Sequence, residues 1–188
     1  MTLFDLTGRV AVVTGGNGGI GLGMARGLAA AGAAVAVAAR NPEKCEAAVA
    51  ALAASGAESA FLAFDVADEG ACRGMIDKAV ARFGRLDILV NNAGTSIRKP
   101  PESYTAAEWH AVLDTNLTGA LFCSQAAYPV MKQAGGGKII NIGSMYSIFG
   151  TSYGAAYAAS KGALVQLTKS LAIAWAGDNI QVNAILPG

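Results

Sequence analysis

The sequence predicts an α/β domain in which a doubly wound parallel sheet lies between two layers of helices, a three-layer α/β/α arrangement. Short β-rich runs alternate with longer alanine-rich stretches along the chain. The expected strands are continuously apolar, as strands covered on both faces are. Hydrophobic residues make up 53% of the 188 residues and charged residues 14%, which is enough for one sizeable core. We therefore expect residues 1–188 to form a single domain.

In the first half of the chain, three strands and three helices are expected in alternation. The strands are the runs VAVVT, AVAVAA and SAFLAFD, at 10–14, 34–39 and 59–65. Helices are expected between them, over about 20–32, 43–55 and 68–84. Pro42 favours the start of the second helix, because proline suits a first helical turn. Gly84 favours the end of the third, where a left-handed residue is often needed.

In the second half, strands are expected at 86–92, 138–144 and 180–186. A long helical region over about 105–133 follows the first of them. Thr105 is its expected N-cap, and Glu108 completes a capping box. A helix from Ala155 to Ala176 precedes the last strand. Right-handed crossovers in such a sheet place ligands beyond the carboxyl ends of the strands, so the informative residues should follow each strand.

Composition excludes several classes of function. The formal charge of +1 gives no electrostatic footprint for nucleic acid or an acidic membrane. Cys45, Cys72 and Cys123 form no CxxC pair, and with a single histidine, His110, they predict neither a metal site nor a His-based hydrolase. An odd, scattered cysteine count fits a reducing cytosol. The sequence shows no signal peptide and no membrane span, so we expect a soluble cytoplasmic protein.

The stretch TGGNGGIG, residues 14–21, follows the first expected strand and opens the first helix. Glycines there allow a tight turn, and the helix N-terminus can hold a pyrophosphate on its N–H groups. Two registers fit: Gly16-x-Gly18-x-x-Gly21 and the wider Gly15-x-x-x-Gly19-x-Gly21. Between a strand and a helix, this motif predicts a Rossmann-type dinucleotide site. The cofactor-binding residues expected in this stretch are Gly15, Asn17, Gly19, Ile20 and Gly21.

The residues after the second strand indicate which dinucleotide binds. A carboxylate that would bind the adenosine 2′-hydroxyl is expected about twenty residues past the glycines. Ala39 and then Arg40 stand there instead. Because a guanidinium suits a phosphate, Arg40 favours NADP(H), while NAD(H) stays possible. The alternative is an Arg that is merely solvated at a strand end.

Two further strand ends add candidate cofactor contacts. Asp65 could accept a hydrogen bond from the adenine amino group while Val66 flanks the ring, although an ordinary loop Asp is an equal alternative. After the fourth strand, the small residues of NNAG let the backbone pass close to a ligand, and a simple turn is the competing account. This adds Asn92, Ala93 and Gly94 to the expected cofactor site.

The fifth strand ends at Ser144, and the next helix carries Tyr157 and Lys161 one turn apart. A tyrosine hydroxyl has a reference pKa near 10 and exchanges protons poorly at neutral pH. A cation about 4 Å away stabilises its phenolate by at most about 4 kcal/mol at an effective dielectric of about 20, so Lys161 should lower the pKa of Tyr157. Tyr153 lies two turns from Lys161, where this effect falls about threefold. Tyr157 is therefore the expected acid/base.

With TGGNGGIG, NNAG, Ser144 and YAASK in this order, the chain resembles the short-chain dehydrogenase/reductase family over its whole length. The resemblance favours the wider glycine register. It implies that Tyr157 exchanges the proton and that Lys161 also binds the nicotinamide ribose. It further implies that Ser144 orients the substrate oxygen and that Asn116, in DTNLTG, holds a relay water. The implied reaction is reversible hydride transfer between the nicotinamide and a carbonyl or alcohol carbon of a small molecule.

The resemblance also concerns the end of the chain, the assembly and the substrate. Pro187 and Gly188 match the start of a loop over the nicotinamide, which would make them cofactor contacts and would mean that a final strand and the substrate lid are absent here. A homodimer or homotetramer is implied. RKPPESYTAAEW and DTNLTGALFCSQA look like members acting on sugar acids, such as gluconate 5-dehydrogenases and 2-deoxygluconate 3-dehydrogenases. Arg98 and Lys99 could bind a carboxylate, but a solvated pair is favoured.

Two alternatives stay open. The first is a 3-oxoacyl thioester reductase, which belongs to the same class of enzyme. The second is a module that binds NADP(H) without turnover.

Overall fold

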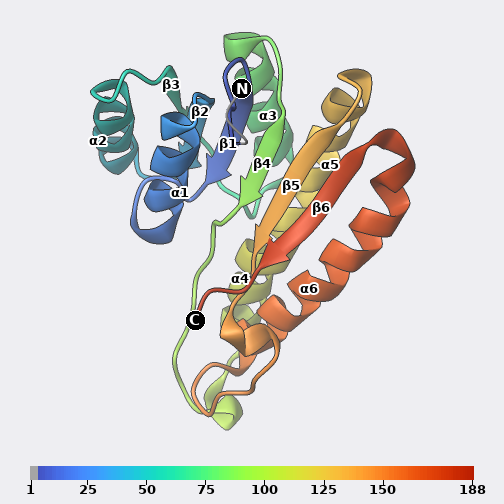
Figure 1. Cartoon of the computed structure of the whole chain (residues 1–188). Coiled ribbons are helices and arrows are strands. Elements are labelled where there is room, and N and C mark those ends of the chain that lie inside the picture. Colours follow the sequence, from blue (N-terminus) through green and yellow to red (C-terminus); the bar gives the residue numbers. More distant parts are fainter. Residues whose placement is uncertain (1–3) are drawn as a thin grey trace.

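The computed structural model describes residues 4–188, so the expectations for Met1–Leu3 lie outside the described residues. Six parallel strands form one sheet in the order β3-β2-β1-β4-β5-β6 (Figure 1). Their bounds are Val10–Thr14, Ala34–Ala39, Ser59–Ala63, Ile88–Asn91, Gly137–Ile142 and Ile180–Ile185 for β1 to β6. From β1 the chain first adds strands on one side, β2 and β3, and then on the other, β4 to β6. In doubly wound sheets a dinucleotide binds at the carboxyl ends of the strands where this change of side occurs, here between β1 and β4.

Helices cover the sheet on both faces (Figure 1). Residues of α1 and α2 pack on one face, and residues of α3, α5 and α6 pack on the other. The α-helices α1 to α6 span Gly19–Ala30, Pro42–Ala53, Glu69–Phe83, Ala106–Leu113, Gly119–Gln133 and Ala155–Trp175. The central strands are buried on both faces, and this explains why β1 and β2 are apolar throughout.

The expected helix signals are present in the structure. Pro42 occupies the first turn of α2, where the Asn41 side chain accepts from the Lys44 N–H. Gly84 ends α3 in the left-handed conformation, with φ 79°. Thr105 and Glu108 form both hydrogen bonds of the capping box at α4.

The helical region expected over 105–133 is not one regular helix. A π-helical turn, η2 (Asp114–Thr118), separates α4 from α5. One extra residue in a turn shifts the apolar pattern by a single position, which cannot be told from its ordinary scatter over so short a stretch. Such wide turns are frequent at functional sites, and this one carries the buried Asn116.

Candidate functional site

Glycine is required at the three positions of the wider register. Gly15 and Gly19 have φ of 63° and 50°, which other residues adopt rarely. A Cβ on Gly21 would lie 2.3 Å from the carbonyl oxygen of Gly15, so the first turn of α1 packs against the end of β1 only without a side chain there. The turn and the close packing together build a glycine cradle at the carboxyl edge.

The amino end of α1 suits an anion. Its N-cap is Gly18, and no side chain caps the first N–H groups of the helix. A Cβ at Gly18 or Gly19 would meet nothing within 4 Å, so there is open space beside these groups. A helix N-terminus with free N–H groups and open space fits the pyrophosphate of a dinucleotide.

Thr14 joins the glycine cradle to the loop after β4. Its buried hydroxyl accepts from the N–H groups of Asn92 and Ala93, both at 3.0 Å. The Asn92 side chain donates back to the carbonyl oxygens of Thr14 and Gly15, at 3.0 and 3.2 Å. Neighbouring strand ends are thereby fixed at the point where the cofactor would cross. Nothing in the sequence singles out Thr14, because a threonine at the end of a strand has no distinctive pattern.

A cavity of about 260 Å³ lies where the adenosine half would bind. Arg40 lines it with a side chain that is 75% exposed, and its guanidinium is 3.8 Å from the Asp65 carboxylate. Asp65 is thus an ion-pair partner of Arg40 in the structure, and it does not line the cavity. Lys44 and Phe64 also line this cavity, although no motif in the sequence points to either residue.

A second cavity, of about 400 Å³, contains the candidate chemistry. Ser144, Tyr157 and Lys161 line it together. The Ser144 Oγ accepts from the N–H of Tyr146 at 3.2 Å, and the Ser144 N–H donates to Ser147 at 3.1 Å. These bonds fix the serine while leaving its hydroxyl proton free for a ligand.

Lys161 is buried beside Tyr157. Its ammonium lies 5.6 Å from the centroid of the Tyr157 ring and donates a 2.6 Å hydrogen bond to the carbonyl oxygen of Ile142. Burial lowers the pKa of Lys161 to about 8. Tyr153, in contrast, precedes α6 and is 58% exposed. The structure therefore places Tyr157, and not Tyr153, with the lysine.

Asn116 is buried behind this cavity and does not line it. Its Oδ1 accepts from the Thr95 N–H at 2.7 Å, and its Nδ2 donates to the Thr95 carbonyl at 2.9 Å and to the Ser160 hydroxyl at 3.0 Å. A Cβ on Gly94 would lie 3.3 Å from this Oδ1 and 3.7 Å from the Lys161 ammonium. Gly94 therefore lies close to both the Asn116 amide and the Lys161 ammonium. Both N–H groups of the Asn116 amide already have acceptors, in Thr95 and Ser160.

The two cavities meet at Gly94, which lines both. Most of the residues expected from the sequence lie along them. The adenosine half contains Gly15, Asn17, Arg40, Val66 and Ala93, and the other half contains Ile20, Asn92, Ser144, Tyr157, Lys161, Pro187 and Gly188. Gly19, Gly21, Asp65 and Asn116 stand outside the two linings.

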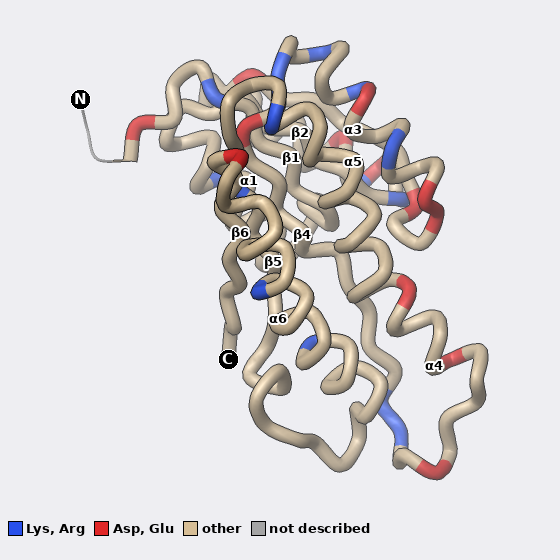
Figure 2. Tube along the Cα trace, turned by 90° about the vertical axis from the view of Figure 1, so that its right-hand side faces the viewer, with Lys and Arg blue, Asp and Glu red and all other residues tan. Residues whose placement is uncertain are grey.

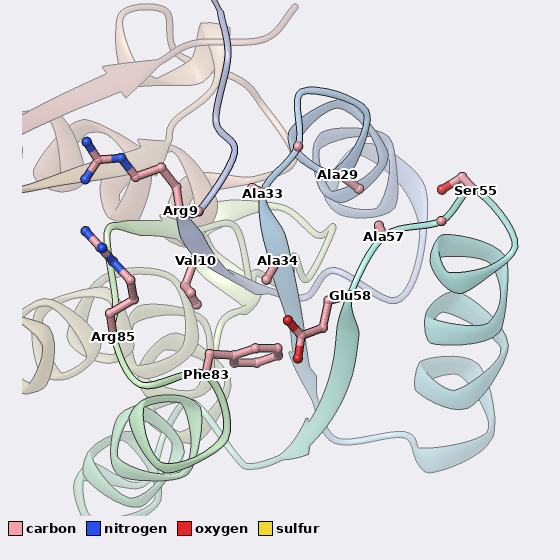
Figure 3. Close-up of a pocket in the computed structure, with 13 residues that line it drawn as sticks. Arg9, Val10, Ala29, Ala33, Ala34, Ser55, Ala57, Glu58, Phe83 and Arg85 are labelled. Atoms are coloured by element: carbon pink, nitrogen blue, oxygen red, sulfur yellow. The ribbon is translucent and has the colours of Figure 1, made fainter.

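A different cavity, of about 300 Å³, lies at the amino edge of the strands. Figure 3 shows that the guanidinium groups of Arg9 and Arg85, which line it, point the same way, away from Phe83 and Glu58. Both donate to the Asp87 carboxylate, at 2.8 and 2.6 Å. Arg9, Arg85 and Asp87 form a cluster at the opposite end of the sheet from the glycine cradle. It joins the start of β1 to the start of β4, because Asp87 also accepts from the Val10 N–H.

The possible carboxylate ligands Arg98 and Lys99 differ in the structure. Lys99 donates to both oxygens of Glu108, at 2.8 and 2.7 Å, so it has a partner already. Arg98 is exposed and forms no ion pair with any residue of 4–188. Of these two residues, Arg98 is therefore the one without an ion-pair partner in the described part of the chain.

The loop between β5 and α6 carries no charged side chain. Figure 2 shows the loop between β5 and α6 without charged residues at the end of the molecule that carries the site. Within the described part of the chain, no three His, Cys, Asp or Glu side chains gather as a metal site would require. None of the helices in that part has the length and apolar character that crossing a bilayer requires.

Known proteins resemble this chain both in sequence and in fold. The sequence profile of the family described as short chain dehydrogenase matches residues 9–188. A tropinone reductase homolog of Arabidopsis thaliana is 39% identical over 185 residues, covering 98% of this chain and 70% of the relative. A 2-dehydro-3-deoxy-D-gluconate 5-dehydrogenase of Dickeya dadantii is 41% identical over 190 residues, covering 100% of this chain and 74% of the relative.

Solved structures agree with the sequence relatives. The structure of an NAD⁺-bound xylitol dehydrogenase superposes with a TM-score of 0.95 at 39% identity. The match covers 97% of this chain and 71% of that one. The similarity therefore extends over nearly all of the sheet and helices described above.

Proposed function

The chain belongs to the short-chain dehydrogenase family and is therefore an NAD(P)-dependent oxidoreductase that acts on CH–OH groups, and we propose that its substrate is a sugar acid and its preferred cofactor NADP(H). One observation carries the assignment of the site: Ser144, Tyr157 and a buried Lys161 line a single cavity at the carboxyl edge of the sheet. The glycine cradle lies at the same edge.

The proposed roles follow from the hydrogen bonds of each side chain. The Ser144 hydroxyl donates a hydrogen bond to the substrate oxygen and keeps its proton, while its Oγ accepts from the Tyr146 N–H. Tyr157 donates or accepts the proton on that oxygen, according to the direction of the reaction. The Lys161 ammonium, 5.6 Å from the centre of the Tyr157 ring, favours the phenolate electrostatically. The nicotinamide, when bound, exchanges a hydride with the carbon that carries this oxygen.

The chain's own residues fit a dinucleotide along the two cavities. The uncapped start of α1 and the open space at Gly18 suit the pyrophosphate. Asn116 supports the loop that carries Thr95 and Gly94. A relay water, as the family resemblance implies, would need an Asn116 group other than its two amide N–H groups.

The preference for NADP(H) rests on two cations. Arg40 and Lys44 both line the adenosine half, and the chain has no carboxylate at the end of β2 to bind a 2′-hydroxyl. The Asp65 carboxylate, 3.8 Å from the Arg40 guanidinium, partly offsets its positive charge and so limits the preference for NADP(H) over NAD(H). NAD(H) should therefore bind as well, but more weakly.

A sugar acid as substrate is supported by a relative that acts on 2-dehydro-3-deoxy-D-gluconate and by the free cation Arg98, which follows the pocket-lining Thr95 and Ser96. A second candidate is a 3-oxoacyl thioester. It is favoured by exposed apolar side chains after β5, among them Ile148 at 71% and Phe149 at 56% exposure. An acyl chain could pack on these side chains, whereas a sugar acid could not.

The test begins with binding and then measures turnover. NADPH and NADH are titrated by fluorescence, followed by assays with D-gluconate, 2-dehydro-3-deoxy-D-gluconate and a 3-oxoacyl thioester. Turnover of a sugar acid, best with the NADP pair, is the expected result. Turnover of the thioester alone would favour the second candidate. Binding without any turnover would favour a module that only senses NADP(H).

Assembly and location complete the proposal. A single domain in a homodimer or homotetramer is supported by the alanine-rich α6, which also exposes 82% of Ile173. A cytoplasmic location is supported by three buried cysteines that form no disulfide among the described residues. Light scattering of the purified protein and fractionation of cells would test these two points.

A further inference from the structure

Ser160 lies between Tyr157 and Lys161 in α6 and has no exposed surface. Its hydroxyl donates to the main-chain carbonyl of Tyr157 at 2.7 Å and accepts from the amide of Asn116 at 3.0 Å. The turn of helix that carries the candidate acid/base and its lysine is therefore joined directly to the π-helical turn.

Asn116 extends this connection to a third element. Its amide bonds both the N–H and the carbonyl of Thr95, in the loop after β4. Of its two N–H groups, one goes to Thr95 and the other to Ser160. Without the Ser160 hydroxyl, a buried N–H would lack its acceptor, and a group in that position shifts or draws in water to satisfy itself.

We propose that Ser160 is a positioning residue for the reaction, fixing the Tyr157–Lys161 turn against Asn116 and the Thr95 loop. The inference rests on the proposed function, because it gives Tyr157 the proton and Lys161 its electrostatic support. Ser160 itself reaches neither substrate nor cofactor in this account. Its hydrogen bonds hold the Tyr157 phenol and the Lys161 ammonium in place relative to Gly94, which lines the same cavity.

The chain contains a matched control in Ser124 of α5. It too has no exposed surface, and its hydroxyl donates to the Ala120 carbonyl at 2.6 Å and accepts from the Asn91 amide at 3.0 Å. Burial and helix setting match those of Ser160, and each hydroxyl donates to a carbonyl one turn earlier and accepts from a buried amide. Neither serine lines the catalytic cavity, but only Ser160 lies in the helix that carries Tyr157 and Lys161. The two serines therefore separate lost stability from lost positioning.

The experiment compares Ser160→Ala, Ser160→Thr and Ser124→Ala with the wild type. The assay is turnover of the substrate found in the panel above. Both alanine variants should lower the melting temperature by similar amounts. Only Ser160→Ala should lower kcat, by about 10- to 100-fold, while the KM for the cofactor changes less than about threefold. The pH at which alcohol oxidation reaches half its maximum should rise in Ser160→Ala and not in Ser124→Ala. Ser160→Thr, which keeps a hydroxyl, should recover most of kcat.

Two results would overturn the inference. One is a kcat for Ser160→Ala within about twofold of the wild type, and the other is an equal loss of kcat in Ser124→Ala. Tyr157→Phe, measured beside them, separates this inference from its premise, because its main-chain carbonyl still bonds Ser160. If Tyr157→Phe keeps its activity, or the wild type turns over no panel member, the proposed function fails and this inference falls with it. If Tyr157→Phe is inactive and Ser160→Ala is normal, the inference alone is wrong.

Discussion

The ammonium of Lys161 donates a 2.6 Å hydrogen bond to the carbonyl oxygen of Ile142, the last residue of β5. The lysine is only 4% exposed, and burial lowers its pKa from the usual 10.5 to about 8. A buried cation with little compensation costs folding free energy. The protein keeps it beside Tyr157, where its charge can serve the chemistry.

The pH dependence of stability should report this lysine. Because its folded pKa is below its unfolded value, the unfolded chain binds more protons between about pH 8 and 10.5. The free energy of unfolding of the wild type should therefore rise over that range by about 3 kcal/mol more than that of Lys161→Met. Urea unfolding without cofactor at several pH values measures this difference. Lys169→Met, which removes an exposed lysine of the same helix, should follow the wild type. Parallel curves for the wild type and Lys161→Met would refute the burial cost.

Two glycines of α1 should respond oppositely to alanine. A Cβ on Gly21 would lie 2.3 Å from the Gly15 carbonyl oxygen, so Gly21→Ala must displace the cradle and should abolish NADPH binding. A Cβ on Gly23 would meet nothing within 4 Å, so Gly23→Ala should keep binding and stabilise the helix by up to about 1 kcal/mol. Fluorescence titration and thermal melting test the pair. Normal NADPH binding by Gly21→Ala would contradict the placement of the pyrophosphate.

Cofactor preference should depend on Arg40. A guanidinium hydrogen-bonded to a phosphate contributes about 1.5 to 3 kcal/mol, so Arg40→Ala should weaken NADPH about tenfold or more. NADH, which lacks the phosphate, should change less than about twofold. Arg26→Ala, at an exposed position of α1, is the control and should alter neither. An equal loss for both cofactors would remove Arg40 from the 2′-phosphate site.

Asp87 should matter for stability and not for chemistry. Burial alone would raise its pKa, but hydrogen bonds from Arg85, Arg9 and the Val10 N–H outweigh burial, and the pKa is lowered. Asp87→Asn should therefore lose about 2 kcal/mol of unfolding free energy at pH 7. The contribution is present above about pH 4 and disappears as the pH falls through the folded pKa, so the two proteins should converge in acid.

The control for this prediction is Glu58→Gln, which breaks an exposed ion pair with Arg82. It should cost less than about 1 kcal/mol. If Asp87→Asn lowers the free energy of unfolding no more than Glu58→Gln does, the hydrogen bonds of Asp87 with Arg9 and Arg85 do not stabilise the fold as we predict.

The sheet was predictable because its strands are short, mainly apolar runs and its helices carry local end signals. The run VAVVT became β1 with the same bounds, and Ala155 begins α6 as expected. The interruption at η2 was not predictable, because one extra residue in a helical turn shifts the apolar pattern by only one position.

The candidate site was predictable where chemistry depends on residue type and position along the chain. Gly21 and Lys161 are such cases. Contacts between distant side chains were not predictable, and the ion pair of Asp65 with Arg40 is one of them. A contact of Asp65 with adenine stays a prediction. Ser160 passed unnoticed because a small residue inside a helix has no distinctive signal until its partner, 44 positions away, is located. Asn116 was found only through the family resemblance.

The central claim is that Tyr157 exchanges the proton on the substrate oxygen, and Tyr157→Phe tests it most directly. Single-turnover kinetics with saturating cofactor should show at least about a thousandfold loss of the chemical step, while NADPH affinity stays within about threefold. Tyr153→Phe removes an exposed hydroxyl four residues earlier and should behave as the wild type. A chemical step in Tyr157→Phe that is as fast as in Tyr153→Phe would contradict the account.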